Sequence, residues 1–370
     1  MTSVFLLAAA FCLYTVAGYP LLLAVLSRRA RPVKKAFAAR RVSVILPVRN
    51  GEHWIARKLE SLLALDYPEE LVEILVVSDG STDATERIAE RYAGKRGVQL
   101  WTVPAGGKAL ALNRALAEAQ GEILFFTDVR QELSRDSLRN LVACFADPAV
   151  GAASGELVIR KGETAGEANV GLYWRYEKWI RLRQSRIDSV IGATGCIYAM
   201  RRELARPLPA ETLADDMYLP LAAFFQGYRV ILDGSAKAFD DPTGLDAEFR
   251  RKVRTLAGVY QIIGFYPALL GPRNRMWFHF LSHKLARLLL PWVLLVLAAT
   301  SFGLPDPWRV AAWCGQAGFY GLAALDGVLP ESSRLKRATS PMRTFAVLMA
   351  ASLCAVAVVF VPPQKLWRSR

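Results

Sequence analysis

The sequence predicts an α/β fold, with a mixed, mostly parallel sheet and flanking helices, attached to transmembrane helices. From residue 42 to about residue 264, short runs of apolar β-formers alternate with helical patterns, which is typical of strands connected through helices. Outside this region lie apolar stretches long enough to cross a bilayer. The mean hydropathy of +0.22 and a hydrophobic content of 53% agree with this division.

The alternating region begins with seven elements in the order strand, helix, strand, helix, strand, helix, strand. The segments are VSVILPV, HWIARKLESLLAL, EILVVSD, TDATERIAERYA, VQLWTVP, KALALNRALAEA and EILFFTD. The strand runs have no polar face, as expected for a parallel sheet covered on both sides. Three of them end in polar residues, at 47–50, at Asp79 and at Asp128. Carboxyl ends of parallel strands meet at one sheet edge, so we expect a pocket for a polar ligand there. The alternative is that these residues are turn formers and helix caps, as Ser81 and Thr82 could be.

Residues 4–26 form an apolar stretch that predicts an uncleaved membrane anchor. A signal peptide is the alternative, but residues 1–3 carry no basic side chain, and the positive charge comes afterwards. Seven basic residues lie between Arg28 and Arg41 and supply half of the formal charge of +14. By the positive-inside rule, the N-terminus is outside and the chain from Arg28 onward is cytoplasmic.

Three more apolar stretches follow, at about 285–304, 310–329 and 344–362. The middle one contains Gln316 and Asp326, so it either crosses, giving four crossings in all, or is re-entrant or interfacial. Residues 259–284 mix aromatic and basic side chains and are predicted to lie at the headgroup level. The five cysteines have no paired spacing, and no nucleic-acid-binding motif is present, so we expect neither a zinc site nor a nucleic-acid partner.

The segment PAGGKALALN contains a glycine pair that enters a helix carrying Lys108 in its first turn. The spacing of a phosphate-binding loop is absent. What remains is suited to an anionic group bound by backbone N–H donors.

Seven motifs occur in a fixed order along the chain: ILPVRNGE, VVSDGSTDAT, GGKALALNRAL, ILFFTD, GATGCIYAMRREL, ADDMYLP and FRRKVRT. Together they resemble the family-2 inverting glycosyltransferases with the GT-A fold, and the flanking apolar segments resemble the membrane-anchored polysaccharide-synthase branch. The resemblance implies a transmembrane anchor at 1–27, a basic cytoplasmic linker at 28–41, a GT-A domain at 42–258, an interfacial amphipathic segment at 259–284, and a C-terminal transmembrane region at 285–370 with two or three helices.

The resemblance also implies where the donor nucleotide binds. The implied residues are Pro47, Asn50, Glu52, Asp79, Lys108 and Asp128. Asp79 would accept from a uracil N3–H and Lys108 would face base or phosphate, while Asp83 would fix the turn. Glu52 stands one residue later than in the family because Gly51 intervenes.

Asp128 matches the first aspartate of the family's Asp-x-Asp element, which binds Mg²⁺ or Mn²⁺ against the diphosphate. Here the element reads Asp128-Val129-Arg130. We expect a divalent ion at Asp128. The alternative is that Arg130 contacts the phosphates directly, or that it is an exposed loop residue.

On the acceptor side, Asp216 matches the family's general base, and Asp215 would orient neighbours or tune the pKa of Asp216. Without the resemblance, this pair would be interpreted as the start of a helix. In FRRKVRT, Arg254 matches the arginine of the family's Gln-x-x-Arg-Trp element, Arg251 stands at the glutamine and Thr255 at the tryptophan. Arg254 would pair with the departing diphosphate, and Arg251 would contact diphosphate or acceptor.

The implied function is transfer of a sugar, with inversion, from a nucleotide-sugar donor, expected to be a UDP-sugar, to a polysaccharide or lipid-linked acceptor. The enzyme would be a multi-pass protein of the inner membrane with a cytoplasmic catalytic domain and contacts to membrane lipids. The alternatives are single-sugar transfer to a lipid, or an inactive nucleotide-sensing scaffold on the same fold.

Overall fold

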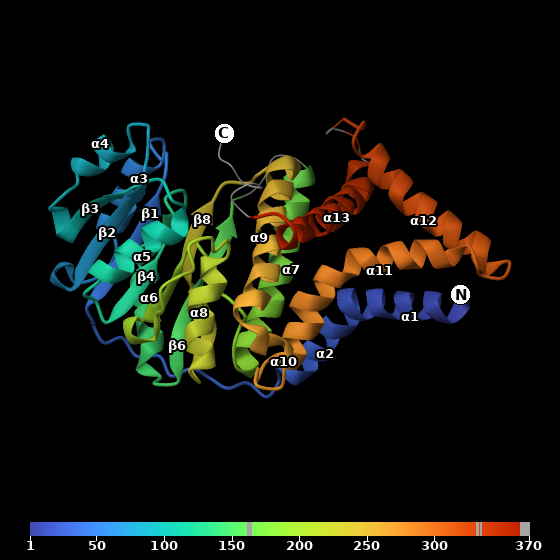
Figure 1. Cartoon of the computed structure of the whole chain (residues 1–370), viewed down its shortest axis with the longest axis horizontal. Helices are drawn as coiled ribbons and strands as arrows, with labels where there is room; N and C mark the ends of the chain where they lie inside the picture. Colours follow the sequence, from blue (N-terminus) through green and yellow to red (C-terminus); the bar gives the residue numbers. More distant parts are fainter. Residues whose placement is uncertain (161–164, 331–332, 334, 363–370) are drawn as a thin grey trace. The chain divides into compact units, whose positions relative to one another are not determined.

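A computed structural model describes residues 1–160, 165–330, 333 and 335–362, with backbone alone for residues 165–172 (Figure 1). The chain forms two compact units. The sheet unit comprises Arg29–Arg160 and Arg181–Asp240, and the helical unit comprises Met1–Arg28, Lys161–Ile180 and Asp241–Arg370. Each unit is described separately below.

The sheet unit is built on an eight-stranded sheet in the order β3-β2-β1-β4-β7-β6-β8-β5. The strands are β1 (Val42–Val48), β2 (Val72–Asp79), β3 (Val98–Val103), β4 (Ile123–Phe126), β5 (Glu132–Leu133), β6 (Val150–Ile159), β7 (Tyr198–Arg201) and β8 (Arg229–Asp240). The four strands predicted from sequence are β1 to β4, and they pair in parallel. β7 pairs antiparallel with both β4 and β6, β5 pairs antiparallel with β8, and β6 pairs in parallel with β8. The predicted mixed, mostly parallel sheet is confirmed.

Helices cover this sheet as the apolar strand runs require. They are α3 (Ile55–Leu63), α4 (Thr85–Glu90), α5 (Lys108–Glu118), α6 (Ser137–Ala143), α8 (Asp215–Phe225) and the C-terminal part of α7 (Ala165–Ile187). α3, α4 and α6 share one hydrophobic core with alternate residues of β1, β2 and β4. α5 packs against β1 and β2, and α8 packs against β6 and β8 (Figure 1). The polar residues at the ends of β1, β2 and β4 therefore follow strands whose side chains are buried.

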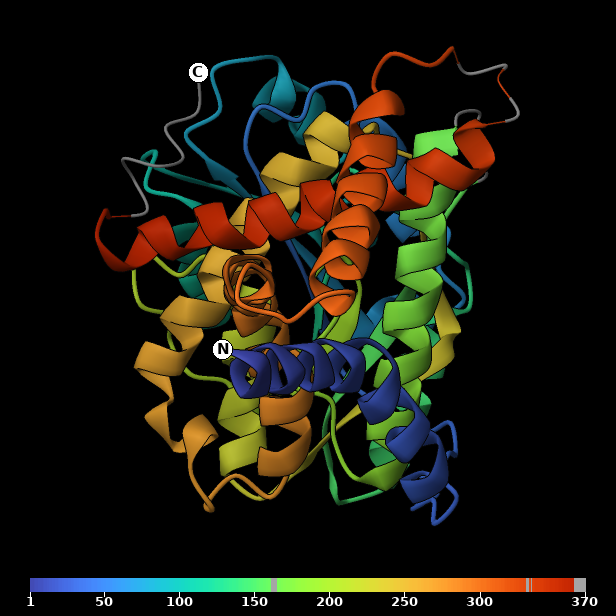
Figure 2. The ribbon, with the colours of Figure 1, turned by 90° about the vertical axis from the view of Figure 1, so that its right-hand side faces the viewer.

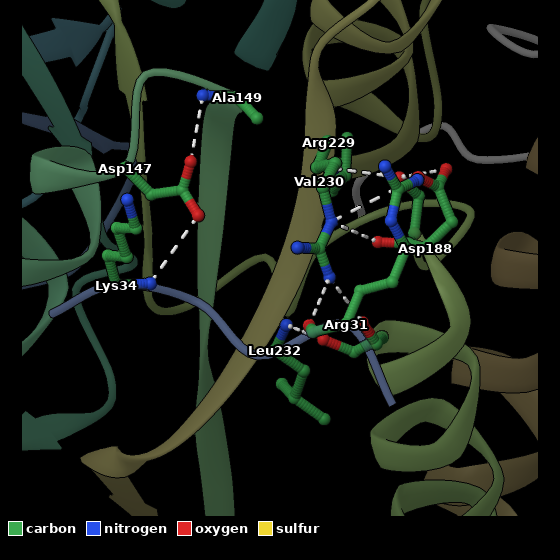
Figure 3. Close-up of polar contacts among 10 residues, drawn as sticks. Arg31, Lys34, Asp147, Ala149, Asp188, Arg229, Val230 and Leu232 are labelled. Atoms are coloured by element: carbon green, nitrogen blue, oxygen red, sulfur yellow. Dashed lines mark hydrogen bonds and ion pairs between the residues drawn. The ribbon is translucent and has the colours of Figure 1, made fainter. Parts of the chain in front are cut away.

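The basic linker is bound to the sheet unit along most of its length. Figure 3 shows Arg31 and Arg229 meeting at Asp188, where Arg31 Nη1 lies 3.3 Å from Asp188 Oδ1 and Arg229 donates to the Arg31 carbonyl at 3.1 Å. Further along, Lys35 Nζ lies 2.7 Å from Asp233 Oδ2 and Arg40 Nη1 lies 3.5 Å from a Glu122 oxygen. Among the described residues, Arg28, Arg29, Lys34 and Arg41 form no ion pair and are exposed. Part of the charge that predicts membrane contact therefore attaches the linker to the sheet unit.

The helical unit contains the apolar segments. Its helices are α1 (Thr2–Leu13), α2 (Tyr19–Leu26), the N-terminal part of α7, α9 (Leu245–Phe265), α10 (Trp277–His279), α11 (Ala286–Ser301), α12 (Trp308–Leu325) and α13 (Lys336–Ala355). π-helical turns at Tyr14–Gly18 and Phe280–Leu285 make α1 continuous with α2 and α10 continuous with α11. α1 packs along α11, and α13 contacts both α9 and α12 (Figure 2).

Within the described residues, three helices are long and apolar enough to cross a membrane: Thr2–Leu26, Trp277–Ser301 and Lys336–Val359. They overlap three of the four predicted crossings. α12 forms a continuous helix over the fourth, but its composition does not place it among these three. The segment predicted to be interfacial divides differently from expectation. It contains the end of α9 and a short turn, and its last residues already belong to the second of the three long helices.

Candidate functional site

The loop after β1 is attached to the loop after β2. Asn50 adopts a left-handed backbone (φ 49°), and its Oδ1 accepts from the Thr82 N–H at 2.8 Å. Glu52 accepts from the Ala84 N–H at 3.0 Å, and its own N–H donates to Asp83 at 3.1 Å. Asp83 also accepts from the Thr85 N–H at 3.0 Å, so it fixes this turn as predicted. One carboxylate oxygen of Glu52 thus holds the two loops together. Pro47, near the end of β1, is partly exposed and lies beside Val77 of β2.

Asp79 ends β2 and is 4% exposed. Its Oδ1 accepts from the Gly106 N–H at 2.7 Å and the Gly107 N–H at 3.0 Å, and Oδ2 lies 3.0 Å from the same Gly107 nitrogen and 3.8 Å from Arg49 Nη1. The glycine pair was predicted to hold an anionic ligand. In the structure the anion on these N–H groups is Asp79 itself, which anchors the loop that leads into α5. Gly107 has a φ of 93°, so a side chain at this turn would be strained.

Lys108, the first residue of α5, joins two carboxylates from different elements. Its Nζ lies 2.9 Å from Asp128 Oδ1, just beyond β4, and 3.0 Å from Asp215 Oδ2, at the start of α8. Burial alone would lower the pKa of Lys108, but the two adjacent carboxylates outweigh it and raise this pKa above its usual value. The lysine therefore remains charged and links the start of α5 to the loop after β4 and to the start of α8.

Asp216 stands next to Asp215 in the first turn of α8. Its carboxylate faces Gly195, where an added Cβ would lie 3.1 Å from Asp216 Oδ2, and its carbonyl accepts from the Ala193 N–H at 2.6 Å. Desolvation, helped by the negative charge of Asp215, raises the pKa of Asp216 to about 6, although Lys108 acts in the opposite direction. A carboxylate with a pKa near working pH is well placed to accept a proton.

Tyr198, on β7, lies close enough to these carboxylates for their charges to act on its hydroxyl. Its ring stacks on Phe126 with centroids 4.5 Å apart, and the side chain is fully buried. Among the described residues its hydroxyl has no hydrogen-bond partner. Desolvation, followed by the charges of Asp215 and Asp216, raises the pKa of Tyr198 well above 10. Tyr198 therefore contributes a neutral phenol close to the cluster.

Arg130, predicted as a possible phosphate contact, is engaged elsewhere in the sheet unit. Its guanidinium hydrogen-bonds to Asp240 at the end of β8, and Gln131 Nε2 donates to the same carboxylate at 2.9 Å. Asp240 is 4% exposed. The loop that carries Asp128 is therefore attached to β8 through Arg130, which leaves Asp128 as the acidic side chain of this element.

Arg251 and Arg254 lie on α9 of the helical unit. Arg251 hydrogen-bonds to Glu248 and its guanidinium lies 5.2 Å from the centre of the Trp174 ring. Arg254 is exposed and has no ion pair among the described residues. Their contacts with diphosphate or acceptor remain predictions.

One buried charged residue beside the site, Lys58, escaped sequence analysis. Lys58 on α3 is 1% exposed, and its Nζ lies 2.6 Å from Thr127 Oγ1, directly before Asp128. A signal was present in the sequence, because Lys58 occupies the apolar stripe of its helix together with Ile55, Leu59 and Leu62. A lysine at a core position needs a polar partner, and that partner could not be identified from the pattern.

The carboxylate oxygens of Asp128 and Asp215 suit a divalent ion whose remaining ligands come from the substrate. Asp128 offers a partly exposed carboxylate and Asp215 a second one, and Mg²⁺-like ions use one or two carboxylates together with phosphate oxygens. The described residues contain no group of three or more His, Cys, Asp or Glu side chains placed to hold a metal alone. The residues fit a metal completed by a diphosphate, not an all-protein cage.

Comparison with known proteins gives a consistent result. Residues 43–208 match the family model described as glycosyl transferase family 2. A beta-monoglucosyldiacylglycerol synthase from Synechocystis sp. is 34% identical over 115 residues, which cover 30% of this chain and 24% of that enzyme. An N-acetylglucosaminyltransferase from Azorhizobium caulinodans is 26% identical over 239 residues, covering 60% of each chain. The matches thus span from about a quarter to just over half of these relatives.

A solved structure extends the similarity to the whole chain. A mannosyltransferase from Pyrobaculum calidifontis, in complex with GDP-Man and Mn²⁺, superposes with a TM-score of 0.74 and 26% identity, covering 99% of this chain and 100% of that one. Together with the family match, this similarity assigns the fold of the sheet unit. Residues 43–208 form a glycosyltransferase family 2 domain, and the sheet unit has the GT-A fold.

Proposed function

We propose that this chain is a membrane-bound inverting glycosyltransferase that moves a sugar from a nucleotide-sugar donor, a UDP-sugar, to a polysaccharide or lipid-linked acceptor at the cytoplasmic face. One observation carries the proposal. Lys108 joins Asp128 to Asp215, and Asp216, beside them, has a pKa raised to about 6. Donor-side and acceptor-side groups that are far apart in sequence thus meet in one place.

The donor nucleotide is assigned to the edge formed by β1, β2 and the start of α5. Asp79, Asn50 and Lys108 lie there on connected loops. A carboxylate such as Asp79 can accept from the N–H of a nucleobase while backbone N–H groups hold its position. A guanine ring also presents N–H donors, so GDP-sugars, as bound by the Pyrobaculum enzyme, are the first competitors to test.

Asp216 acts as the general base. It removes the proton from the acceptor hydroxyl as that oxygen attacks the anomeric carbon, and the bond from that carbon to the diphosphate breaks on the opposite face. Attack from the opposite face inverts the configuration. Asp215 bonds to Lys108, so it holds the neighbouring cation and tunes the charge around Asp216.

A divalent cation, Mg²⁺ or Mn²⁺, is assigned to Asp128, with Asp215 as the second ligand. When bound, such an ion would neutralise charge on the diphosphate. Electrostatics supports the assignment, because three carboxylates, Asp128, Asp215 and Asp216, lie near Lys108, which contacts the first two. A diphosphate would add more negative charge to an already acidic cluster.

Membrane attachment is supported by the three long apolar helices, of which the first precedes the basic linker. The arginines of α9, Arg251 and Arg254, are assigned to the diphosphate and the acceptor. The relatives favour no single acceptor, since one is named as a synthase of a glycolipid and another as an N-acetylglucosaminyltransferase.

The test uses detergent-purified full-length protein, a panel of UDP- and GDP-sugars, Mn²⁺ or Mg²⁺, and lipid extract as acceptor. Sugar transfer with inversion, lost in Asp216→Asn, is expected, and product length separates one-sugar addition from polymerisation. If no donor is consumed while nucleotide still binds, the inactive-scaffold alternative is correct.

A further inference from the structure

Lys58 places a buried amine inside the sheet unit. The side chain is 1% exposed and lies among the apolar residues of α3. Among the described residues no carboxylate lies within ion-pair distance of its Nζ. Burying an ammonium without a counter-ion is costly, so its hydrogen bonds must be well formed and the site must have a reason to keep it.

Lys58 binds both ends of the loop that carries Asp128. Nζ lies 2.6 Å from Thr127 Oγ1 and 2.6 Å from the Gln131 carbonyl oxygen. These residues immediately flank the Asp128-Val129-Arg130 element. A single side chain from α3 thus closes the base of this loop and limits the positions that the Asp128 carboxylate can take.

Thr127 extends this connection to the acceptor side. Its hydroxyl accepts from Lys58 and donates to the Cys196 carbonyl at 2.8 Å. Cys196 belongs to the turn before β7, where Gly195 faces the Asp216 carboxylate and the Ala193 N–H binds the Asp216 carbonyl. The chain of contacts Lys58–Thr127–Cys196 therefore joins the loop of Asp128 to the turn that supports Asp216.

We propose that Lys58 and Thr127 are positioning residues that set the distance between the donor-side carboxylate Asp128 and the acceptor-side base Asp216. The proposal rests on the proposed function. In-line transfer needs the acceptor oxygen, the anomeric carbon and the diphosphate in register, and a displacement of about 1 Å can cost about 100-fold in rate. Both side chains are buried, so we expect them to act through the backbone and side chains that they hold.

The decisive variants are Thr127→Val, which keeps the shape and removes the hydroxyl, and Thr127→Ser, which keeps the hydroxyl. For Thr127→Val we expect kcat to fall at least about tenfold with the donor Kd within about threefold, because the link to the Asp216 turn is cut. Thr127→Ser should recover most of the rate. Thr300→Val, which removes a buried hydroxyl bonded to a carbonyl in the helical unit, is the matched control and should leave kcat unchanged.

Lys58→Met tests the other end of the chain. It frees both ends of the Asp128 loop, so it should weaken donor binding as well as kcat, a pattern distinct from that of Thr127→Val. The double variant should be no slower than Lys58→Met alone, because both changes cut the same connection.

Wild-type kcat in folded Thr127→Val would overturn the proposal, and so would failure of both Thr127→Val and Lys58→Met to fold, which would make the two residues structural. An inactive wild-type protein would instead contradict the proposed function.

Discussion

The Lys108 ammonium lies 3.0 Å from Oδ2 of Asp215, the residue directly before the proposed base. It also contacts Asp128, so it occupies the position between the two carboxylates that are best placed to hold a divalent ion. A divalent ion bound there, as proposed, would therefore compete with the lysine for the same oxygens, and donor binding would resolve the competition by drawing the ammonium toward phosphate.

Lys108→Met should strengthen Mn²⁺ binding to the donor-free protein by about tenfold or more, since two charges at about 4 Å interact by about 4 kcal/mol near a protein surface. The same variant should bind the donor more weakly because a phosphate partner is lost. Electron paramagnetic resonance of free Mn²⁺ measures the first effect without any turnover. Lys108→Arg, which keeps the charge, is the control. Unchanged Mn²⁺ affinity in Lys108→Met would show that the ion binds elsewhere.

Asp216→Asn should abolish transfer and leave the donor Kd nearly unchanged, because an amide cannot accept the acceptor proton while its size is the same. Isothermal titration with donor and a radiolabelled transfer assay measure the two effects. Glu70→Gln, an exposed change away from the cluster, is the control. A turnover above about a tenth of wild type would remove Asp216 from the mechanism.

The rate should depend on pH through the same residue. With a pKa of about 6, Asp216 is protonated below that pH and cannot act as a base, so kcat/KM should rise as pH increases through about 6 and level off above it. The unfolding temperature, measured across the same range, separates this effect from loss of structure. A flat profile between pH 5 and 7 would contradict the assignment.

Asp79→Ala should lower both the donor affinity and the stability of the protein. It leaves the Gly106 and Gly107 N–H groups without their acceptor, and bonds to a charged partner contribute about 1.5–3 kcal/mol. Asp79→Asn should be intermediate, since one oxygen remains to accept. Nucleotide titration and thermal unfolding report the two effects. Donor binding as tight as wild type in both variants would show that Asp79 is only a loop anchor.

We expect the buried Lys58 to make the unfolding free energy of the protein depend on pH. Desolvation lowers the Lys58 pKa to about 7, partly opposed by Cys196, Asp128 and Glu132, whereas the unfolded lysine titrates near 10.5. Between these values the unfolded state binds the extra proton, so this residue makes the protein more stable as pH rises, by up to about 1.4 kcal/mol per pH unit. Below about pH 7 its contribution is constant. The unfolding free energy of Lys58→Met relative to wild type should therefore fall from pH 7 to 9, and a constant difference would contradict the buried, deprotonating lysine.

The parallel half of the sheet could be predicted almost to the residue. The run VSVILPV is β1, and EILVVSD forms most of β2, because an apolar run with no polar face has to be covered on both sides. The strands β6, β7 and β8, which include the antiparallel strand β7 and the parallel pair β6–β8, were not predicted individually. Their pairing depends on contacts between distant segments, and their sequences carry no comparable signal.

The sequence allowed us to predict which residues belong to the candidate site, but not which residues they contact. The strand ends indicated that Asp79 and Asp128 would lie at one sheet edge, and the resemblance added Lys108 and Asp216. The sheet unit places Lys108 in contact with Asp128 and with Asp215, the neighbour of Asp216. The sequence alone did not indicate that Asp79 holds the glycine pair, nor that Arg130 binds Asp240.

The sequence by itself determined which segments are buried, which strands run in parallel and which acidic residues stand at strand ends, because periodicity and turn chemistry act over a few neighbouring residues. Only the tertiary structure decided the partner of each charged group. Arg130 and Asp240 are 110 residues apart, and Lys58 and Thr127 are 69 apart. Such contacts depend on how the strands and helices pack in space, and local sequence patterns carry no record of that packing.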